Sequence, residues 1–362
     1  MARGPKELAI VTGVPGWLGT SLVEALIYGL PTADLSASTH AALLTGTSDR
    51  TVRVFSLPDQ DRSKLARFGE QLQVVSGDLV SGSGLDKLFE NARGATVFHV
   101  AGVIHPTRGT RELYQVNSEG TEKLLEAAIK AGARRFIYVS SNSPIGTNPD
   151  RNTLFDERSP YNPYMHYGKS KKAAEEKVNA AGQSGRIETV IIRPPWFYGP
   201  GQPPRQTLFF TMIKNGKAPI VGSGQNLRSM AYVDNICQGL MLCEAIEQAQ
   251  GKTYWIADSR PYTMNEVVDT IERLLERDFN LPVAHKRMRL PDLASEVALA
   301  VDAGLQAAGL YHQKFHVLSE MNKDIACSID LARHDLGYNP QIALEEGMRR
   351  SIAYIIESGQ TI

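Results

Sequence analysis

The chain alternates between short apolar runs and longer stretches in which apolar residues recur with helical spacing. The apolar runs, which we expect to be strands, are 7–12, 51–57, 72–77, 95–102, 135–141 and 189–194. The helix-like stretches between them are 17–29, 83–92, 117–131 and 164–181. Strands that are buried on both faces of a parallel sheet read as continuous apolar runs. The pattern therefore predicts right-handed βαβ crossovers and an α/β fold with a doubly wound parallel sheet.

The texture of the chain changes after Pro194, where PPWFYGPGQPPRQ is rich in proline and glycine, as turn regions are. We therefore expect a first domain over 1–195 and a smaller, mostly C-terminal α/β substrate lobe over 196–362. Residues 225–250 are expected to return to the first domain. Within the second lobe, Thr263 and Glu266 have capping-box spacing, which predicts a helix over 263–275. A further helix is predicted over 290–310, and its largely apolar surface indicates packing in a core or a dimer.

Composition narrows the class of protein. Lysine plus arginine and aspartate plus glutamate each total 39, so the net charge of zero predicts no nucleic-acid partner and no anionic membrane. The three cysteines, Cys237, Cys243 and Cys327, lack the spacing of metal ligands or of a disulfide framework. We expect no metal site and a reducing compartment. No signal peptide and no run of ~20 apolar residues is found, so the prediction is a cytoplasmic protein outside the membrane.

The motif TGVPGWLG at 12–19 directly follows the first predicted strand and opens the first predicted helix. Its three glycines have the spacing of a turn that lets backbone approach a pyrophosphate, and the helix N-terminus supplies N–H donors. An ordinary tight turn is the alternative. The position after the first strand of a βαβ unit favours a Rossmann dinucleotide-binding domain. The residues expected to line the cofactor here are Gly13, Gly16, Trp17, Leu18 and Gly19.

Two later strand ends agree with a dinucleotide site. Asp78 follows the third predicted strand, where its carboxylate can accept a hydrogen bond from an adenine amino group, and Leu79 lies beside it. A helix N-cap or turn aspartate is the alternative for Asp78. Ala101 and Gly102 end the next strand, and such small residues leave room for a flat cofactor, although simple turn chemistry also selects them.

The segment YGKSK at 167–171 carries the candidate chemistry. Tyr167 and Lys171 are four residues apart, so they point to the same side of a helix, and an upstream strand ends at Ser141. We expect Lys171 to favour the phenolate and lower the pKa of Tyr167 from about 10, while Ser141 hydrogen-bonds the reacting oxygen. Tyr167 would exchange a proton with a hydroxyl or carbonyl as hydride passes to or from a nicotinamide ring. A solvent-facing Tyr/Lys pair on a charged helix is the alternative.

The chain resembles the extended short-chain dehydrogenase/reductase family, often labelled the NAD-dependent epimerase/dehydratase group, over nearly its whole length. The motifs that carry the resemblance are, in order, TGVPGWLG, GDLV, FHVAG, VNSEGT, YVSSNS, YGKSK, RPPWFYGPG and YVDN. The resemblance implies that Tyr167 is the catalytic tyrosine and that Lys171 also holds the nicotinamide ribose. Ser141 matches the active-site serine, with Ser140 and Ser143 close in register. The remaining implied positions are Pro194 and Pro195 on the nicotinamide side, and Trp196 and Phe197 at the start of the substrate pocket.

The substrate class stays open between two readings. Arg228 matches the arginine that clamps the diphosphate in similar nucleotide-sugar epimerases and dehydratases, although Ser229 replaces the usual acid after it. This favours hydride transfer at a carbinol or carbonyl carbon of a nucleotide-sugar, by an epimerase or a reductase. The apolar stretch 290–310 resembles instead the 3-beta-hydroxysteroid dehydrogenase-like members, which act on hydrophobic alcohols or ketones. His105, Arg108 and Arg205 either face substrate or lie on mobile loops.

Two further alternatives are set against these readings. A dehydratase is not expected, because Asn142 and Ser143 stand where that class carries an acid pair after the serine. A non-catalytic NAD(P)-sensing protein would be expected to lose Tyr167 or Lys171, and this chain retains both.

The end of the second strand bears on the form of the cofactor, and the long helices bear on the assembly. The second strand ends at Ser56 and Leu57, which do not distinguish NAD from NADP, but acids on the following loop favour NAD slightly. That loop carries Asp59, Asp61 and Arg62. The segment 31–50 is an insertion that we expect near the adenosine. Relatives commonly pair through two long helices, so a homodimer through 117–131 and 164–181 is expected.

Overall fold

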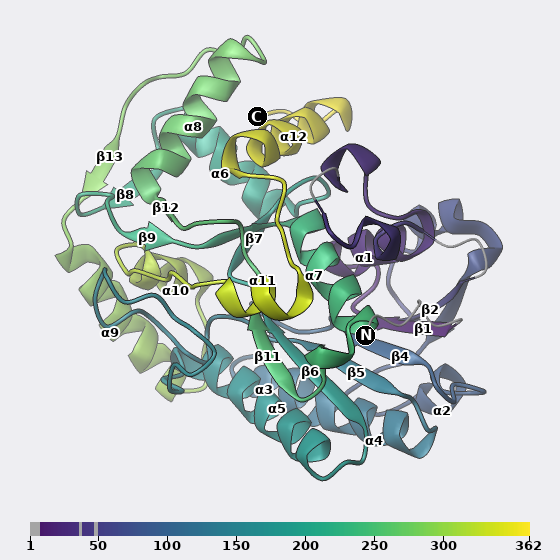
Figure 1. Ribbon diagram of the computed structural model, residues 1–362. Helices are drawn as coiled ribbons and strands as arrows, with labels where there is room; N and C mark the ends of the chain where they lie inside the picture. Colours follow the sequence, from purple (N-terminus) through teal and green to yellow (C-terminus); the bar gives the residue numbers. More distant parts are fainter. Residues whose placement is uncertain (1–7, 36–37, 47–49) are drawn as a thin grey trace.

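The computed structural model describes residues 8–35, 38–46 and 50–362, and a parallel sheet lies at its centre (Figure 1). The sheet has seven strands in the order β11-β6-β5-β4-β1-β2-β3. Every predicted strand is confirmed to within a few residues at its ends; β6 begins one residue earlier than predicted, and Glu7 lies outside the described residues. The strands are β1 (Leu8–Thr12), β2 (Thr51–Ser56), β3 (Leu72–Ser76), β4 (Thr96–His99), β5 (Arg135–Val139), β6 (Glu188–Arg193) and β11 (Lys252–Trp255).

Helices cover both faces of this sheet, as the apolar strands require (Figure 1). Ala9 and Val11 of β1 pack in one core with the helices α1 (Trp17–Tyr28) and α7 (Val233–Ala245). Ile10, between them, points to a second core with α2 (Leu85–Leu88), α4 (Thr121–Lys130) and α5 (Met165–Gln183). The predicted helix 117–131 starts earlier than expected. It continues α3 (Arg111–Tyr114) through a π-helical turn, η4 (Gln115–Gly120), into α4.

Outside the central sheet, the described residues form three two-stranded sheets, β10-β7, β12-β9 and β13-β8, and further helices. Glu266 N donates to Thr263 Oγ1 at 3.0 Å, so the predicted cap begins α8. The return to the sheet runs through α7 to Trp255, beyond the predicted limit of 250. No helix in the described ranges is long and apolar enough to cross a membrane. The remaining strands are β7 (Trp196–Tyr198), β8 (Pro219–Val221), β9 (Leu227–Arg228), β10 (Met230–Tyr232), β12 (Tyr262–Thr263) and β13 (Met288–Leu290); the helices are α6 (Pro204–Lys214), α8 (Met264–Arg277), α9 (Leu293–Ala307), α10 (Gln313–Glu320), α11 (Asp330–Leu336) and α12 (Leu344–Glu357).

Helix α9 turns its polar side inward. Its buried positions are Ser295, Ala298, Asp302 and Gln306, which recur at helical spacing on one face. The apolar Leu293 is 68% exposed and lies on the opposite face. The helix predicted over 290–310 is therefore confirmed, but the interpretation of its apolar surface as core packing is wrong. Hydrogen bonds explain the inversion, because Ser295 Oγ donates to the carbonyl oxygens of Leu318 and Ser319 at 2.9 Å.

The described parts of the insertion 31–50, which are 31–35, 38–46 and 50, connect the end of α1 to the start of β2. Because α1 runs back from the carboxyl edge, both its end and the start of β2 lie at the amino edge of the sheet. The expected position of the insertion near the adenosine stays a prediction. The insertion contains η1 (Thr32–Leu35) and η2 (Ala41–Leu43), while η3 (Ser63–Gln71) and η5 (Glu247–Ala249) lie elsewhere.

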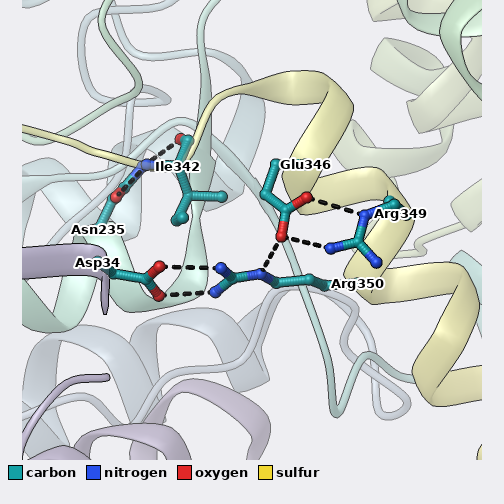
Figure 2. A network of polar contacts seen from close by, with 6 residues as sticks. All are labelled: Asp34, Asn235, Ile342, Glu346, Arg349 and Arg350. Atoms are coloured by element: carbon teal, nitrogen blue, oxygen red, sulfur yellow. Dashed lines mark hydrogen bonds and ion pairs between the residues drawn. The ribbon is translucent and has the colours of Figure 1, made fainter. Parts of the chain in front are cut away.

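An ion pair fastens this insertion to the last helix (Figure 2). Both terminal nitrogens of Arg350 donate to the Asp34 carboxylate, at 2.7 and 2.9 Å. Arg350 Nε donates to Glu346 Oε1 at 2.6 Å, so one planar guanidinium joins η1 to α12. Close by, Asn235 Nδ2 donates to the Ile342 carbonyl at 2.7 Å, which ties α7 to the segment before α12.

Candidate active site

The glycine turn between β1 and α1 brings backbone against the end of β4. Gly13 has φ +82°, and a Cβ atom there would lie 2.7 Å from Ala101 N. A Cβ atom on Gly19 would lie 2.4 Å from Gly13 O, so larger residues would push the turn open. The N-terminus of α1 has no side-chain cap and no acid in its first turn. Its N–H donors are thus available for phosphate oxygens, and the turn fits the pyrophosphate of a dinucleotide.

The other predicted cofactor residues lie along the same sheet edge. Ala101 N donates to Thr12 Oγ1 at 3.1 Å, which joins the end of β4 to the turn. Asp78 Oδ1 accepts a hydrogen bond from Val80 N at 2.9 Å, so this carboxylate caps its own turn. Its predicted contact with adenine stays a prediction. Leu79 is buried beside Asp78.

The buried side chain of Asn117 joins several segments at this edge of the sheet by hydrogen bonds. Sequence analysis gave Asn117 no role. Its Oδ1 accepts from Val103 N at 2.7 Å, and its Nδ2 donates to Val103 O at 2.9 Å and to Ser170 Oγ at 3.1 Å. It lies in the π-helical turn η4, and such turns are frequent at functional sites. A Cβ atom on Gly102 would lie 3.2 Å from Lys171 Nζ, so Gly102 leaves space for that amine.

The predicted catalytic side chains converge at the carboxyl end of β5. Tyr167, Ser141 and Lys171 are all buried, with exposed fractions of 8%, 8% and 3%. The Ser141 hydroxyl acts on the Tyr167 phenol and lowers its pKa, and Ser141 Oγ donates to Asn142 Oδ1 at 3.3 Å. Lys171 Nζ donates to Val139 O at 2.9 Å and lies 4.8 Å from the ring centroid of Tyr138.

The protonation of Tyr167 differs from the expectation. Burial raises the pKa of Tyr167 to about 12, against the lowering effects of the Ser141 hydrogen bond and the Arg205 charge. Lys171 was expected to lower this pKa; its amine donates to the Val139 carbonyl, and its effect on the phenol stays a prediction. Burial in turn lowers the pKa of Lys171 to about 8, with the Glu175 carboxylate acting against it. The phenol therefore holds its proton near neutral pH and is set to donate it.

A buried ion pair supports α5 behind this triad. Arg193 donates to the Glu175 carboxylate through Nε at 3.0 Å and Nη2 at 2.6 Å, and the Tyr161 hydroxyl donates to Glu175 at 2.8 Å. The exposed fractions of Arg193 and Glu175 are 5% and 0%. The pair joins α5 to the end of β6, immediately before buried Pro194. Sequence analysis did not predict this ion pair. Glu175 lies in a stretch that is typical of a solvent-exposed helix, and Arg193 lies eighteen residues later at the end of an apolar strand.

Aromatic residues connect the glycine turn to the second lobe. The rings of Trp17 and Phe197 have centroids 4.8 Å apart, and Trp17 Nε1 donates to Pro200 O at 2.7 Å. Trp196 packs edge-on against Phe209 at 5.6 Å. The start of the predicted substrate region therefore lies against the predicted cofactor turn.

Arg62 covers the end of β2. Its guanidinium donates to Ser56 Oγ at 3.2 Å, to Ser76 Oγ at 2.9 Å and to Leu57 O at 2.7 Å. Asp61 turns away and accepts from Ser63 N at 2.9 Å, so it caps η3 instead. At the strand end that meets the adenosine ribose in dinucleotide-binding sheets, the group in place is a cation.

Of the three ambiguous residues, His105 and Arg205 belong to the site and Arg108 does not. His105 Nδ1 is hydrogen-bonded to the Tyr311 hydroxyl at 2.5 Å. Burial lowers the pKa of His105 to about 4, and the charges of Arg205 and His316 lower it further, so this imidazole is neutral. The Arg108 side chain is 76% exposed and reaches only Glu112 at 3.4 Å.

Arg228 lies in the second lobe without a counter-ion in contact. In the part of the chain that the structure describes, its guanidinium makes no hydrogen bond or ion pair, and its Nε is buried. The charges that act on it come from Glu320, Asp324 and the Tyr164 phenol. Tyr164 directly precedes α5, so Arg228 acts on a residue at the N-terminal end of the helix that carries Tyr167.

The sequence matches the model of the 3-beta hydroxysteroid dehydrogenase/isomerase family over residues 10–287. It is 46% identical to the uncharacterized protein y4nL of Sinorhizobium fredii, across 98% of this chain and 96% of that protein. It is 28% identical to 3beta-hydroxysteroid-dehydrogenase/decarboxylase isoform 1 of Arabidopsis thaliana, across 95% of this chain and 78% of the plant protein. Among solved structures, the fold is similar to that of UDP-glucuronic acid 4-epimerase from Bacillus cereus in complex with NAD, with a TM-score of 0.72, 19% identity, and coverage of 97% of this chain and 99% of the epimerase.

Proposed function

Because this chain belongs to the 3-beta hydroxysteroid dehydrogenase/isomerase family of extended short-chain dehydrogenases/reductases, we propose that it is a nicotinamide-dinucleotide-dependent reductase of a ketone. The single observation that carries the proposal is the convergence of the buried Tyr167, Ser141 and Lys171 side chains at the carboxyl end of β5. With its pKa raised to about 12 by burial, the phenol is a proton donor near neutral pH. Reduction of a carbonyl needs such a proton donor, and the same phenol accepts the proton back in the reverse oxidation.

In the proposed reaction, each group at the site has its own role. A bound nicotinamide dinucleotide supplies the hydride, and the glycine turn with the uncapped start of α1 holds its phosphates. Ser141 hydrogen-bonds the substrate oxygen, and Tyr167 gives it a proton as negative charge develops. Lys171 holds the ribose. Asn142 and Ser143 put an amide and a hydroxyl beside Ser141, so we do not include dehydration in the proposal.

The test is turnover with defined carbonyl compounds. Purified protein is mixed with NADPH or NADH and a panel of steroid, aliphatic and aryl ketones, and oxidation of the reduced nicotinamide is followed by absorbance. We expect at least one hydrophobic ketone to be reduced, and the matching alcohol to be oxidised more slowly at neutral pH. If the protein binds the dinucleotide but reduces none of them and interconverts no nucleotide-sugar, the non-catalytic alternative takes precedence.

The nucleotide-sugar reading remains the second candidate because Arg228 has a guanidinium without a partner in the described residues. If Arg228 binds a diphosphate, the variant Arg228→Ala is expected to weaken UDP binding by about 1.5–3 kcal/mol, the range for hydrogen bonds to charged groups. Titration calorimetry measures this, with Arg349→Ala on α12 as the control. If the wild-type protein has no measurable affinity for UDP, the nucleotide-sugar reading is wrong and ketone reduction is the candidate function that remains.

We further propose that the protein prefers NADP(H), because Arg62 covers the end of β2. This reverses the slight lean to NAD, since Asp61 is occupied at η3. A 2′-phosphate would gain charge-assisted hydrogen bonds from the guanidinium. The variant Arg62→Ala is expected to weaken NADPH binding roughly ten- to a hundredfold and to leave NADH binding nearly unchanged.

Fluorescence titration of both dinucleotides measures this preference. Arg53→Ala, on the same strand, is the control, because Arg53 binds Gln73 and the carbonyls of Leu88 and Glu90 instead. A wild-type protein that binds NADH more tightly than NADPH contradicts the assignment of Arg62.

A further inference from the structure

A buried histidine at the end of β4 joins the glycine turn to the helical segment before α4. His99 Nδ1 lies 2.8 Å from Thr12 Oγ1, and His99 Nε2 lies 2.8 Å from Thr121 Oγ1. All three residues have an exposed fraction of 0%. Thr12 ends β1 directly before Gly13, and Thr121 begins α4 directly after the π-helical turn η4. One imidazole ring therefore bridges the turn proposed to hold the dinucleotide and the turn that carries Asn117.

The neighbouring hydrogen bonds fix the direction of this chain of contacts. The Thr121 hydroxyl donates its one hydrogen to the Asn117 carbonyl at 2.7 Å, so toward the ring it accepts from His99 Nε2–H. His99 Nδ1 is then unprotonated and accepts from the Thr12 hydroxyl. The oxygen of that hydroxyl in turn accepts from Ala101 N at 3.1 Å. A single tautomer of His99 thus satisfies every group in the chain.

A charged imidazole does not fit this arrangement. Protonation of His99 would place a second N–H against Thr12 Oγ1 and leave the Thr12 hydroxyl hydrogen without its acceptor. Burial, with the charge of Lys171 acting in the same direction, lowers the pKa of His99 to about 3. The ring also packs against Phe136 and Tyr138, with centroid distances of 5.7 and 5.5 Å. The direction of the hydrogen bonds is therefore retained at neutral pH.

Beyond Thr121, the chain of hydrogen bonds reaches the catalytic helix. Asn117 Nδ2 donates to Ser170 Oγ at 3.1 Å, and Ser170 Oγ donates to the Tyr167 carbonyl at 2.8 Å. The Thr121 hydroxyl bonds back to the carbonyl four residues earlier, a pattern that bends helices, and His99 fixes the position of that hydroxyl. The imidazole thereby stabilises the π-helical form of η4, which presents Asn117 to α5.

We propose that His99 is a positioning residue, which holds the dinucleotide turn and the helix of Tyr167 and Lys171 in one fixed relation. Because His99 is fully buried, it acts through Thr12 and Thr121 and not by contact with the substrate. The dinucleotide phosphates are held at one end of the chain and the proton donor at the other, and a shift of about 1 Å in such an arrangement can cost a hundredfold in rate. This inference rests on the proposed ketone reduction, to which it adds a positioning group.

The variant His99→Phe tests this role. Phenylalanine retains an aromatic ring and removes both hydrogen bonds of the imidazole, while the bond from Ala101 N to Thr12 Oγ1 is retained. We therefore expect kcat for ketone reduction to fall about ten- to a hundredfold, while KM for the ketone and the dissociation constant of the dinucleotide change less than about threefold. Steady-state kinetics and fluorescence titration measure the three constants. A variant with the wild-type kcat overturns the proposal.

Ser351→Ala is the control for a purely structural loss. The Ser351 hydroxyl is buried in α12 and donates to the Gly347 carbonyl at 2.8 Å. Its removal is expected to lower the thermal midpoint and to leave kcat unchanged. If His99→Phe behaves in the same way as Ser351→Ala, His99 has a structural role only and the proposal is wrong.

Substitutions at Thr121 keep the test decisive even where His99→Phe fails to fold. Thr121→Val retains the shape of the side chain without its hydroxyl, whereas Thr121→Ser retains the hydroxyl. We expect Thr121→Val to lower kcat about tenfold and Thr121→Ser to recover most of that loss. Since Thr12 and Thr121 act through one imidazole, the double variant Thr12→Val/Thr121→Val should lose less kcat than the product of the two single losses. Equal kcat in the valine and serine variants, or losses that multiply, contradict the proposal.

The two proposals fail in distinguishable ways. If ketones are reduced but kcat is unchanged in His99→Phe and Thr121→Val, ketone reduction stands and the positioning role is wrong. If no ketone is reduced, the proposed reaction is wrong, and amide hydrogen exchange still tests the connection without turnover. Bound dinucleotide should then slow exchange in η4 of the wild-type protein and not in η4 of His99→Phe. Equal protection of η4 in both proteins overturns the role of His99.

Discussion

Replacing Tyr167 with phenylalanine is expected to lower kcat for ketone reduction by about a hundred- to ten-thousandfold, the range for the loss of a general acid. The change removes one oxygen atom from a buried side chain, so the fold and the dinucleotide site are retained. The phenol is buried beside Ser141, and its burial raises the pKa to about 12, so it carries its proton at neutral pH. Steady-state kinetics with the best ketone measures the effect.

Dinucleotide binding and thermal stability serve as internal controls for this variant. Tyr28→Phe is the matched control, because the Tyr28 hydroxyl donates to Arg67 O on an exposed surface. Its kcat should equal that of the wild-type protein. A Tyr167→Phe enzyme with more than a tenth of the wild-type kcat would show that another group delivers the proton.

Replacing Glu175 with glutamine is expected to lower the free energy of unfolding by about 3–5 kcal/mol, the cost of leaving a buried charge without its partner. Arg193 would keep its charge in a site with 5% exposure, and no other carboxylate contacts it in the described residues. The substitution is also expected to lower the pKa of Lys171, because the Glu175 carboxylate, one turn away on the same helix, raises that pKa. Denaturant unfolding and the thermal midpoint measure the change.

The adjacent residue supplies a sharp control. Glu176 is 54% exposed and pairs with Lys172 on the surface, so Glu176→Gln is expected to cost under about 1 kcal/mol. The double variant Glu175→Leu/Arg193→Met removes both charges and should recover part of the lost stability. Equal destabilisation by Glu175→Gln and Glu176→Gln would mean that the buried pair contributes little.

Local signals made much of this fold predictable. Each strand of the Rossmann sheet up to residue 193 was visible as an apolar run, because parallel strands are buried on both faces. Thr263 and Glu266 predicted the start of α8 from their spacing alone. The approach of Ser141 to Tyr167 followed from the rule that parallel strands end at one edge.

The features that could not be predicted depend on contacts with residues on other elements of the fold. The side of α9 that faces inward depends on His316, fourteen residues beyond Asp302 and on another helix. The seventh strand, β11, is too short and mixed in composition to stand out as an apolar run. Lys171 was given a direct role toward Tyr167, because helical spacing shows which side a lysine points to and not which carbonyl its amine reaches.

The contact between Asp34 and Arg350 has a consequence for how the protein is made. The two residues are separated by 316 positions, so the segment after α1 leaves the ribosome long before its partner helix exists. At about 5–20 residues/s, synthesis of the intervening chain takes roughly a quarter of a minute to a minute. During that time the acid of η1 has no guanidinium to bind. The segment that contains η1 therefore gains this contact only when translation has nearly ended. In a chain that terminates before α12, Asp34 would lack its ion pair with Arg350.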